Sequence, residues 1–382
     1  MEKLTKSFPL LSVAIAFFSS LFFTTLCAQD SPKLEIGGAL RFNYNLSSWK
    51  AEQKNRGGDF GYDMFRVNAV AEYKGIYVNA EYRLYSESFG GGMLKQGWFG
   101  YKFNEKDELQ LGLTQVPFAI QQYNSHNWFF NLGYYMGLED DHDMGIKYMH
   151  LGNHVEYQLA YFKNAEELRF GDASDVSYSR YSYDVAGNNK EVHQGNLKLV
   201  YKWGDSLQSR LGASAQYGGL YNIITKKIGN HYAFAGHYEA FYKLWNLKAE
   251  AMLVAHNPIN ETGNSEEIIT MAAYGAPYEV AADFNLYTLA VSRNIPVDWG
   301  PVSNLQVYND FGYMQKEKSS FEDSFMNVTG VLVTAGHLYT YIDYAAGYNH
   351  SWLGGNFVDD FAAGNPDAKW EARFNINFGY YF

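Results

Sequence analysis

Acidic side chains cluster in the segment Glu139-Asp140-Asp141-His142-Asp143. Clustered carboxylates supply the oxygen ligands that Ca²⁺ prefers, so a calcium site is the first chemistry that this segment suggests. The segment lacks the spaced acidic positions and the central glycine of a dedicated calcium loop. We therefore expect a solvated loop return here, and no metal site.

Nucleophile and zinc motifs are missing from the sequence. The segment Gly212-Ala-Ser214-Ala-Gln216 lacks the final glycine of a nucleophile elbow and lies in an expected strand. The 10 histidines are scattered, without a zinc-binding helix pattern. The sequence thus predicts neither an enzyme nor a cofactor. A barrel enzyme or an adhesion platform with a plugged lumen remains an alternative.

Aromatic residues make up 18% of the chain, with 33 Tyr and 27 Phe. Five of them lie close together: Trp128, Phe129, Phe130, Tyr134 and Tyr135. Aromatic faces can stack against sugar rings, so this run could bind an oligosaccharide. It could also pack a folded loop against a wall, and we favour this second interpretation.

The N-terminus indicates export. Residues 1–28 combine a short basic start, an apolar run and the small residue Ala28, which is the pattern of a cleaved signal peptide. Cys27 is the only cysteine, so a mature chain of residues 29–382 would have no disulfide. That chain contains no apolar run near the roughly 20 residues that a membrane helix needs. The net charge of −11 argues against nucleic-acid binding.

Apolar and polar residues alternate over segments of about ten residues along the whole mature chain, which is the pattern of tilted membrane strands. The expected strands are 33–46, 65–73, 75–85, 94–103, 108–115, 143–150, 155–163, 195–203, 207–218, 231–245, 247–256, 283–293, 303–314, 325–335, 338–349 and 369–382. Short links alternate with long ones. We therefore predict one all-β domain, a transmembrane antiparallel β-barrel of about 16 strands with short periplasmic turns and long extracellular loops.

A soluble β-sandwich with the same faces turned inward would not explain the two classes of connection. The last strand, Trp370 to Phe382, carries an apolar face for lipid and a terminal aromatic residue. That ending resembles the signal read by the outer-membrane assembly machinery, which we expect as a partner.

Two segments resemble the family of phosphate-selective porins O and P. They are Gly112-Leu-Thr-Gln-Val-Pro-Phe118 and the return Gly137-Leu-Glu-Asp-Asp-His-Asp-Met-Gly145. The resemblance implies a 16-stranded, homotrimeric diffusion porin of a Gram-negative outer membrane. It also implies that the third loop, about residues 116–142, folds into the lumen and narrows it. The residues expected at this constriction are Gln115, Phe118, Gln121, Gln122, Tyr123, Asn124, His126, Trp128, Glu139, Asp140 and Asp141.

Charge at the constriction sets the sign of the ion that enters. Residues 115–146 contain no Lys or Arg, so we do not carry phosphate selectivity over. The expected lumen wall is mixed: Arg41, Arg66, Glu81, Arg83, Lys102, Lys147, Arg210, Glu239, Asp343 and Arg373. These charges could orient polar solutes, but we favour simple pairing across neighbouring strands.

The sequence therefore predicts an outer-membrane porin, surrounded by lipid, through which small hydrophilic solutes and ions diffuse passively. A channel that binds a specific oligosaccharide, or an anion such as phosphate, is the first alternative.

Overall fold

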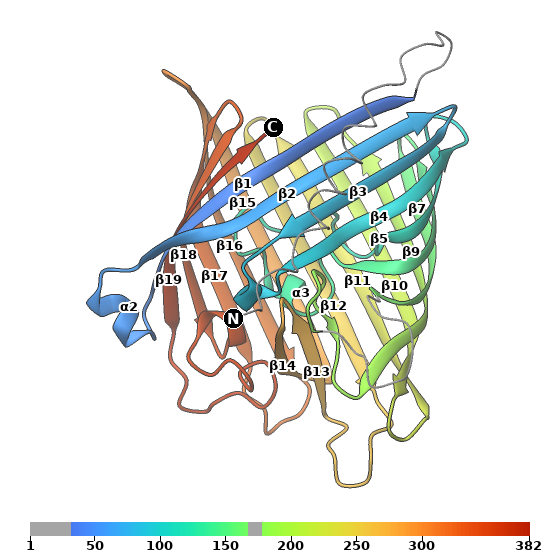
Figure 1. The fold of residues 1–382 in the computed structure, drawn as a ribbon, viewed down its shortest axis with the longest axis vertical. Coiled ribbons are helices and arrows are strands. Elements are labelled where there is room, and N and C mark those ends of the chain that lie inside the picture. The colour runs from blue at the N-terminus through green and yellow to red at the C-terminus, as the bar shows by residue number, and fades with distance from the viewer. Residues whose placement is uncertain (1–31, 167–177) are drawn as a thin grey trace, which may run out of the picture.

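The chain folds into a closed antiparallel barrel of 16 strands in the computed structural model, which describes residues 32–166 and 178–382 (Figure 1). The barrel follows the order β1-β19-β18-β17-β16-β15-β12-β11-β10-β9-β7-β6-β5-β4-β3-β2. The predicted fold class is confirmed. The expected signal peptide, residues 1–28, lies outside the described residues.

The barrel strands lie close to the predicted segments. They are β1 (Lys33–Ser47), β2 (Asp59–Tyr73), β3 (Ile76–Leu84), β4 (Gly92–Lys102), β5 (Asp107–Gln115), β6 (His142–Leu151), β7 (Val155–Ala165), β9 (Asn189–Trp203), β10 (Leu207–Asn222), β11 (Ile228–Tyr242), β12 (Trp245–Asn257), β15 (Asp283–Trp299), β16 (Val302–Lys316), β17 (Ser324–Ala335), β18 (Leu338–Tyr348) and β19 (Glu371–Tyr381). One turn was predicted wrongly. The expected strands 231–245 and 247–256 meet at Trp245-Asn246, whereas the turn is Lys243-Leu244, because Lys243 takes the positive φ of 51° that reverses the chain.

Side-chain alternation separates two faces of every strand, as β9 illustrates. Leu197, Leu199 and Tyr201 are 50%, 51% and 53% exposed on the outside. Lys198 and Val200, which point inward, are 5% and 2% exposed. Because successive side chains alternate sides, the same pattern produces an apolar outer belt and a polar inner wall.

The two ends of the barrel differ in their connections. One end has tight turns such as Lys74-Gly75 and Gly336-His337. The other end carries the long connections, with helix α2 (Ala51–Asn55), helix α3 (Leu132–Tyr135) and the short turns η1 (Glu87–Phe89) and η2 (Ser351–Leu353). Among the described residues, no helix is long and apolar enough to cross a membrane.

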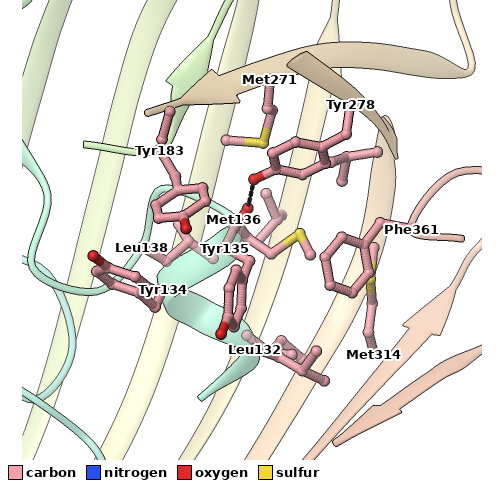
Figure 2. Packing of buried hydrophobic residues seen from close by; sticks show 14 of the residues in the cluster. Leu132, Tyr134, Tyr135, Met136, Leu138, Tyr183, Met271, Tyr278, Met314 and Phe361 are labelled. Atoms are coloured by element: carbon pink, nitrogen blue, oxygen red, sulfur yellow. Dashed lines mark hydrogen bonds between the residues drawn. The ribbon is translucent and has the colours of Figure 1, made fainter. Parts of the chain in front are cut away.

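Three short strands form a second sheet, in the order β14-β13-β8, that the sequence did not predict. They are β8 (Asp184–Val185), β13 (Ile268–Ala273) and β14 (Ala276–Ala281), all within the long connections. Together with α3 they build an aromatic core (Figure 2), in which the Tyr278 hydroxyl donates to the Tyr135 carbonyl. The long connections therefore pack on one another and on inner wall residues such as Met314.

We predict that an arginine on the outer belt destabilises the barrel according to its depth in the bilayer. Leu199→Arg, in the middle of the belt, should cost about 2–4 kcal/mol, because the charge would face hydrocarbon. Leu338→Arg, beside the Gly336-His337 turn, should cost about 0–1 kcal/mol. Urea unfolding in lipid vesicles measures both. Equal costs at the two positions would contradict this placement of the belt.

Candidate functional site

The connection between β5 and β6, residues 116–141, runs along the inner wall of the barrel. Five of its backbone N–H groups donate to side chains on four different strands. The bonds are Ala119 to Ser214 of β10 (3.1 Å), Ile120 to Glu250 of β12 (2.7 Å), His126 and Asn127 to Asp310 of β16 (2.7 and 3.1 Å) and Trp128 to Asp343 of β18 (3.1 Å). These contacts lie far from the loop's own strands, so the loop crosses the interior.

Side chains of the predicted constriction residues hold the loop in place. Gln121 accepts from Lys198 and from Gln158, each at 2.9 Å, and Asn124 donates to Glu250. The two ring nitrogens of His126 lie 2.8 Å from Asp310 and 2.7 Å from Asn246. Lys147 donates to the carbonyl of Gln115 at 2.8 Å. Phe118 is buried, with 3% of its surface exposed.

Two cavities lie beside this loop. The first, of about 390 Å³, reaches the long connections and includes Lys50, Gln53 and Trp352 among its lining residues. The second, of about 650 Å³, extends toward the short turns and is lined by Tyr339, Tyr381, Gln122 and Tyr123 among others. Both cavities share Arg41, Arg83, Trp128 and Phe130. We call these four residues the junction, because they lie where the two cavities meet.

Arginine side chains dominate the charge around the junction. The charged residues that line the second cavity are Arg41, Arg66 and Arg83, and no carboxylate is among its lining residues. Each arginine has an acidic partner: Asp63 lies 2.7 Å from Arg41, and Glu81 lies 3.2 Å from Arg66 and 2.6 Å from Arg83. Glu81 lines neither cavity, whereas Asp63 lines the first cavity but not the second.

Trp128 forms the opposite side of the junction. Its indole N–H donates to Asn43 at 2.9 Å, and the Arg41 guanidinium carbon lies 4.8 Å from its ring centre. All five residues of the aromatic run line the first cavity. Tyr134 and Tyr135, 5% and 4% exposed, also pack within the aromatic core. The run therefore combines the packing role that we favoured with a surface toward the cavity.

The acidic residues of the loop lie elsewhere. Glu139, Asp140 and Asp141 are 4%, 4% and 7% exposed and line neither cavity, so the expected solvated loop return is wrong. The physical reason is close packing of the return segment against the residues that precede β8. Gly137, at φ 69°, permits this approach, because a Cβ there would lie 2.4 Å from the carbonyl oxygen of Tyr183.

Burial and neighbouring charges shift the pKa values of Glu139 and Asp140 in opposite directions. Burial would raise the pKa of Asp140, but Lys95, 2.7 Å away, holds it below its usual range. Burial raises the pKa of Glu139 well above its usual range, and the negative charge of Glu250 adds to the shift. Glu139 accepts from the Asn124 N–H at 3.0 Å, and its other oxygen has no hydrogen-bond partner.

The remaining predicted wall residues lie outside the junction. Arg210 of β10 pairs with Glu239 of the neighbouring β11 at 3.5 Å, and with Glu156 of β7, two strands away, at 2.7 Å. Lys102 lies 3.5 Å from Glu72 near the short turns. Arg373 lines the first cavity, with its guanidinium carbon 5.1 Å from the Trp49 ring centre.

Sequence reasoning missed the residues that the long connections bring to the first cavity: Lys50, Phe89, Tyr183, Tyr274 and Trp352. They come from distant loops, and no periodic pattern in the sequence marks such residues. Tyr62 and Tyr85 were missed as well.

No protein-family model and no curated protein matches the chain. Solved structures share its fold over most of both chains. The outer membrane channel DcaP of Acinetobacter baumannii has a TM-score of 0.60 and 10% identity, covering 94% of this chain and 100% of that one. An anion-selective porin from Comamonas acidovorans has a TM-score of 0.56 and 11% identity, covering 92% and 100%.

A loop deletion mutant of OmpT, an outer membrane protein of Vibrio cholerae, has a TM-score of 0.57 and 14% identity, covering 92% of this chain and 100% of that one. At these identities the comparisons establish a shared barrel fold. The phosphate-selective porin family in particular is not confirmed.

We predict that Glu139→Gln stabilises the protein, and more so as pH rises. A carboxyl group whose pKa is raised in the folded state keeps a proton that the unfolded chain loses, so folding stability falls as pH increases. Glutamine retains the acceptor for Asn124 and cannot ionise. Thermal midpoints from tryptophan fluorescence at pH 5 and pH 8 test this, with exposed Glu105→Gln as the control. A gain that is equal at both pH values would contradict the buried, unpaired state of Glu139.

Proposed function

We propose that the protein is a porin of the Gram-negative outer membrane through which small hydrophilic solutes diffuse passively, with a preference for anions. The observation that carries the proposal is the group of Arg41, Arg66 and Arg83 along a cavity without a lining carboxylate. A closed barrel of 16 strands and its likeness to solved porins support the channel part.

The preference for anions follows from where the charges lie. Fixed charges at the narrowest part of a pore favour the opposite sign in the entering ion. The loop brings no cation of its own, and its three acids are buried away from both cavities. In the second cavity the sign is therefore set by the arginines of the wall. The first cavity also has more cations, with Arg41, Lys50, Arg83 and Arg373 beside Asp59 and Asp63.

Export and assembly belong to the same proposal. Residues 1–28 would direct export and be removed, and the terminal strand ending at Phe382 would be read by the assembly machinery. The exposed aromatic residues of β19 and the C-terminus, among them Tyr380 and Phe382 at 52% and 61% exposure, would then face lipid or a second copy. A homotrimer is the assembly that we propose.

Reversal potential in a planar bilayer under a KCl gradient tests the function. The wild-type protein should prefer chloride, and Arg66→Gln should reduce the chloride-to-potassium permeability ratio by at least twofold. Arg66 suits this test because Arg83 still pairs with Glu81 after the change. Lys102→Gln removes the same charge at a residue that lines neither cavity and should leave the ratio nearly unchanged.

A cation preference in the wild-type protein would contradict the proposed role of the arginines. A silent bilayer with correctly folded protein would contradict the channel itself and favour a plugged barrel.

The first cavity favours a second candidate function, a channel that binds its solute. Aromatic side chains cover much of this cavity, including Tyr85, Phe89, Trp128 and Trp352. Its cations, Arg41, Lys50, Arg83 and Arg373, outnumber its carboxylates, Asp59 and Asp63. Aromatic faces together with guanidinium groups would suit an acidic oligosaccharide, whose rings stack and whose carboxylates pair.

We predict that trigalacturonate, an acidic oligosaccharide, blocks the ion current saturably if this second function holds. Trp352→Ala should then weaken the block by about tenfold, because Trp352 lines only the first cavity. Current noise analysis provides the measurement, and Trp245→Ala, on the outer face of β12, is the control. An ion current that trigalacturonate does not block at any concentration would contradict the binding channel and support the general porin.

A further inference from the structure

Three carboxylates from separate segments meet beneath the return of the third loop. Asp141 ends that loop, Asp143 lies in β6 and Asp184 lies in β8. One carboxylate oxygen from each lies within 4.8 Å of the other two. The three residues are 7%, 1% and 2% exposed, so water does not solvate them freely. Two regions that are distant in the sequence thus bring like charges together where water has little access.

The described residues around this cluster leave one oxygen atom of each carboxylate without a hydrogen-bond partner. Asp141 Oδ1, Asp143 Oδ1 and Asp184 Oδ2 have no hydrogen-bond partner. Gln194 donates to the other oxygen of Asp143 at a long 3.4 Å. Each side chain is more than nine-tenths buried with an unpartnered oxygen, which is a separate observation from the clustering of the acids.

Arg180 approaches the cluster but does not neutralise it. Its Nη1 lies 3.8 Å from Asp184 Oδ2, beyond hydrogen-bond distance. Its Nη2 donates to the Val185 carbonyl at 2.7 Å, and its Nε donates to the Ala272 carbonyl at 3.4 Å. Arg180 is therefore oriented by backbone oxygens, and one positive charge faces the three carboxylates, to which Glu166 and Glu191 add negative charge nearby.

An ionised carboxylate buried without a partner is costly, and three in contact are more so. We propose that Asp141, Asp143 and Asp184 together bind one calcium ion. Ca²⁺ takes oxygen ligands at about 2.3–2.6 Å, so two ligands of one ion lie at most about 5 Å apart. The oxygen atoms of the three aspartates satisfy that limit. The ion accepts irregular geometry, which suits carboxylates from a loop, a barrel strand and an inner strand.

Such an ion would hold the third loop in place where its last residue, Asp141, leads into β6. Asp141 adjoins Asp140, which pairs with Lys95 of β4 and accepts from Tyr181 at 2.6 Å. Calcium would join the loop to β6 and to β8, so that all three segments resist separation together. The proposal rests on the buried carboxylates alone and does not depend on what passes through the barrel.

Calorimetric titration with CaCl₂ tests the site on full-length mature protein, folded in detergent and freed of metal with EDTA. We expect one saturable site with Kd below about 1 mM, and a higher thermal midpoint with calcium than with EDTA. Asp143→Asn combined with Asp184→Asn should weaken binding at least tenfold. Asp360→Asn removes a buried carboxylate outside both the cluster and the third loop and should leave calcium affinity unchanged.

The heat-dependent electrophoretic shift of folded barrels reports whether each variant folds. If the double variant does not fold, Asp141→Asn serves in its place. Wild-type protein that is folded and shows no saturable calcium binding would overturn the proposal. So would equal affinity in the wild type and the double variant, and tighter binding of MgCl₂ than of CaCl₂ would overturn the choice of ion.

Discussion

Closure of the sheet is the constraint on which the rest of this structure depends. In a bilayer every backbone N–H and C=O group needs an internal partner, and a sheet meets that need only if it has no edge. Here β1 pairs with β19 along Ala39–Ser47 and Tyr381–Arg373, so the first and last strands complete the ladder. Closure turns one face of every strand toward lipid and commits the other face, with all its polar and charged side chains, to the interior.

The interior is filled because closure of the barrel turns these polar and charged side chains inward. Polar and charged residues on the inner wall need partners. The third loop provides backbone N–H groups at Ser214, Glu250, Asp310 and Asp343, and amide side chains at Glu250 and Asp310. The aromatic core formed by α3 and the β13–β14 hairpin fills further space (Figure 2). The cavities that remain run beside β1, β2 and β3, where Arg41, Arg66 and Arg83 face them. The arginine-lined passage is thus what the loop leaves open.

Periodicity in the sequence was enough to predict the strands and their faces, because alternation is a local property that each strand carries in its own residues. Arg41, Arg66, Arg83 and Arg373 were placed on the inner wall for this reason. The orientation of Glu139, Asp140 and Asp141 was not predictable in that way. Their burial depends on β8, which lies more than 40 residues further along the chain. The sequence showed that residues 115–146 contain no Lys or Arg, and only the packing shows which charges reach the cavities.

A disulfide between the loop and the wall would test the central claim, that residues 116–141 lie inside the barrel. The mature chain is expected to contain no cysteine, so the pair Ala119→Cys and Ser214→Cys can be introduced alone. In the native structure the Ala119 N–H donates to Ser214 Oγ at 3.1 Å. We predict that mild oxidation crosslinks this pair in outer membranes, detected by electrophoretic mobility after unfolding without reductant. Two free thiols that both react with a bulky maleimide, and form no crosslink, would contradict the account.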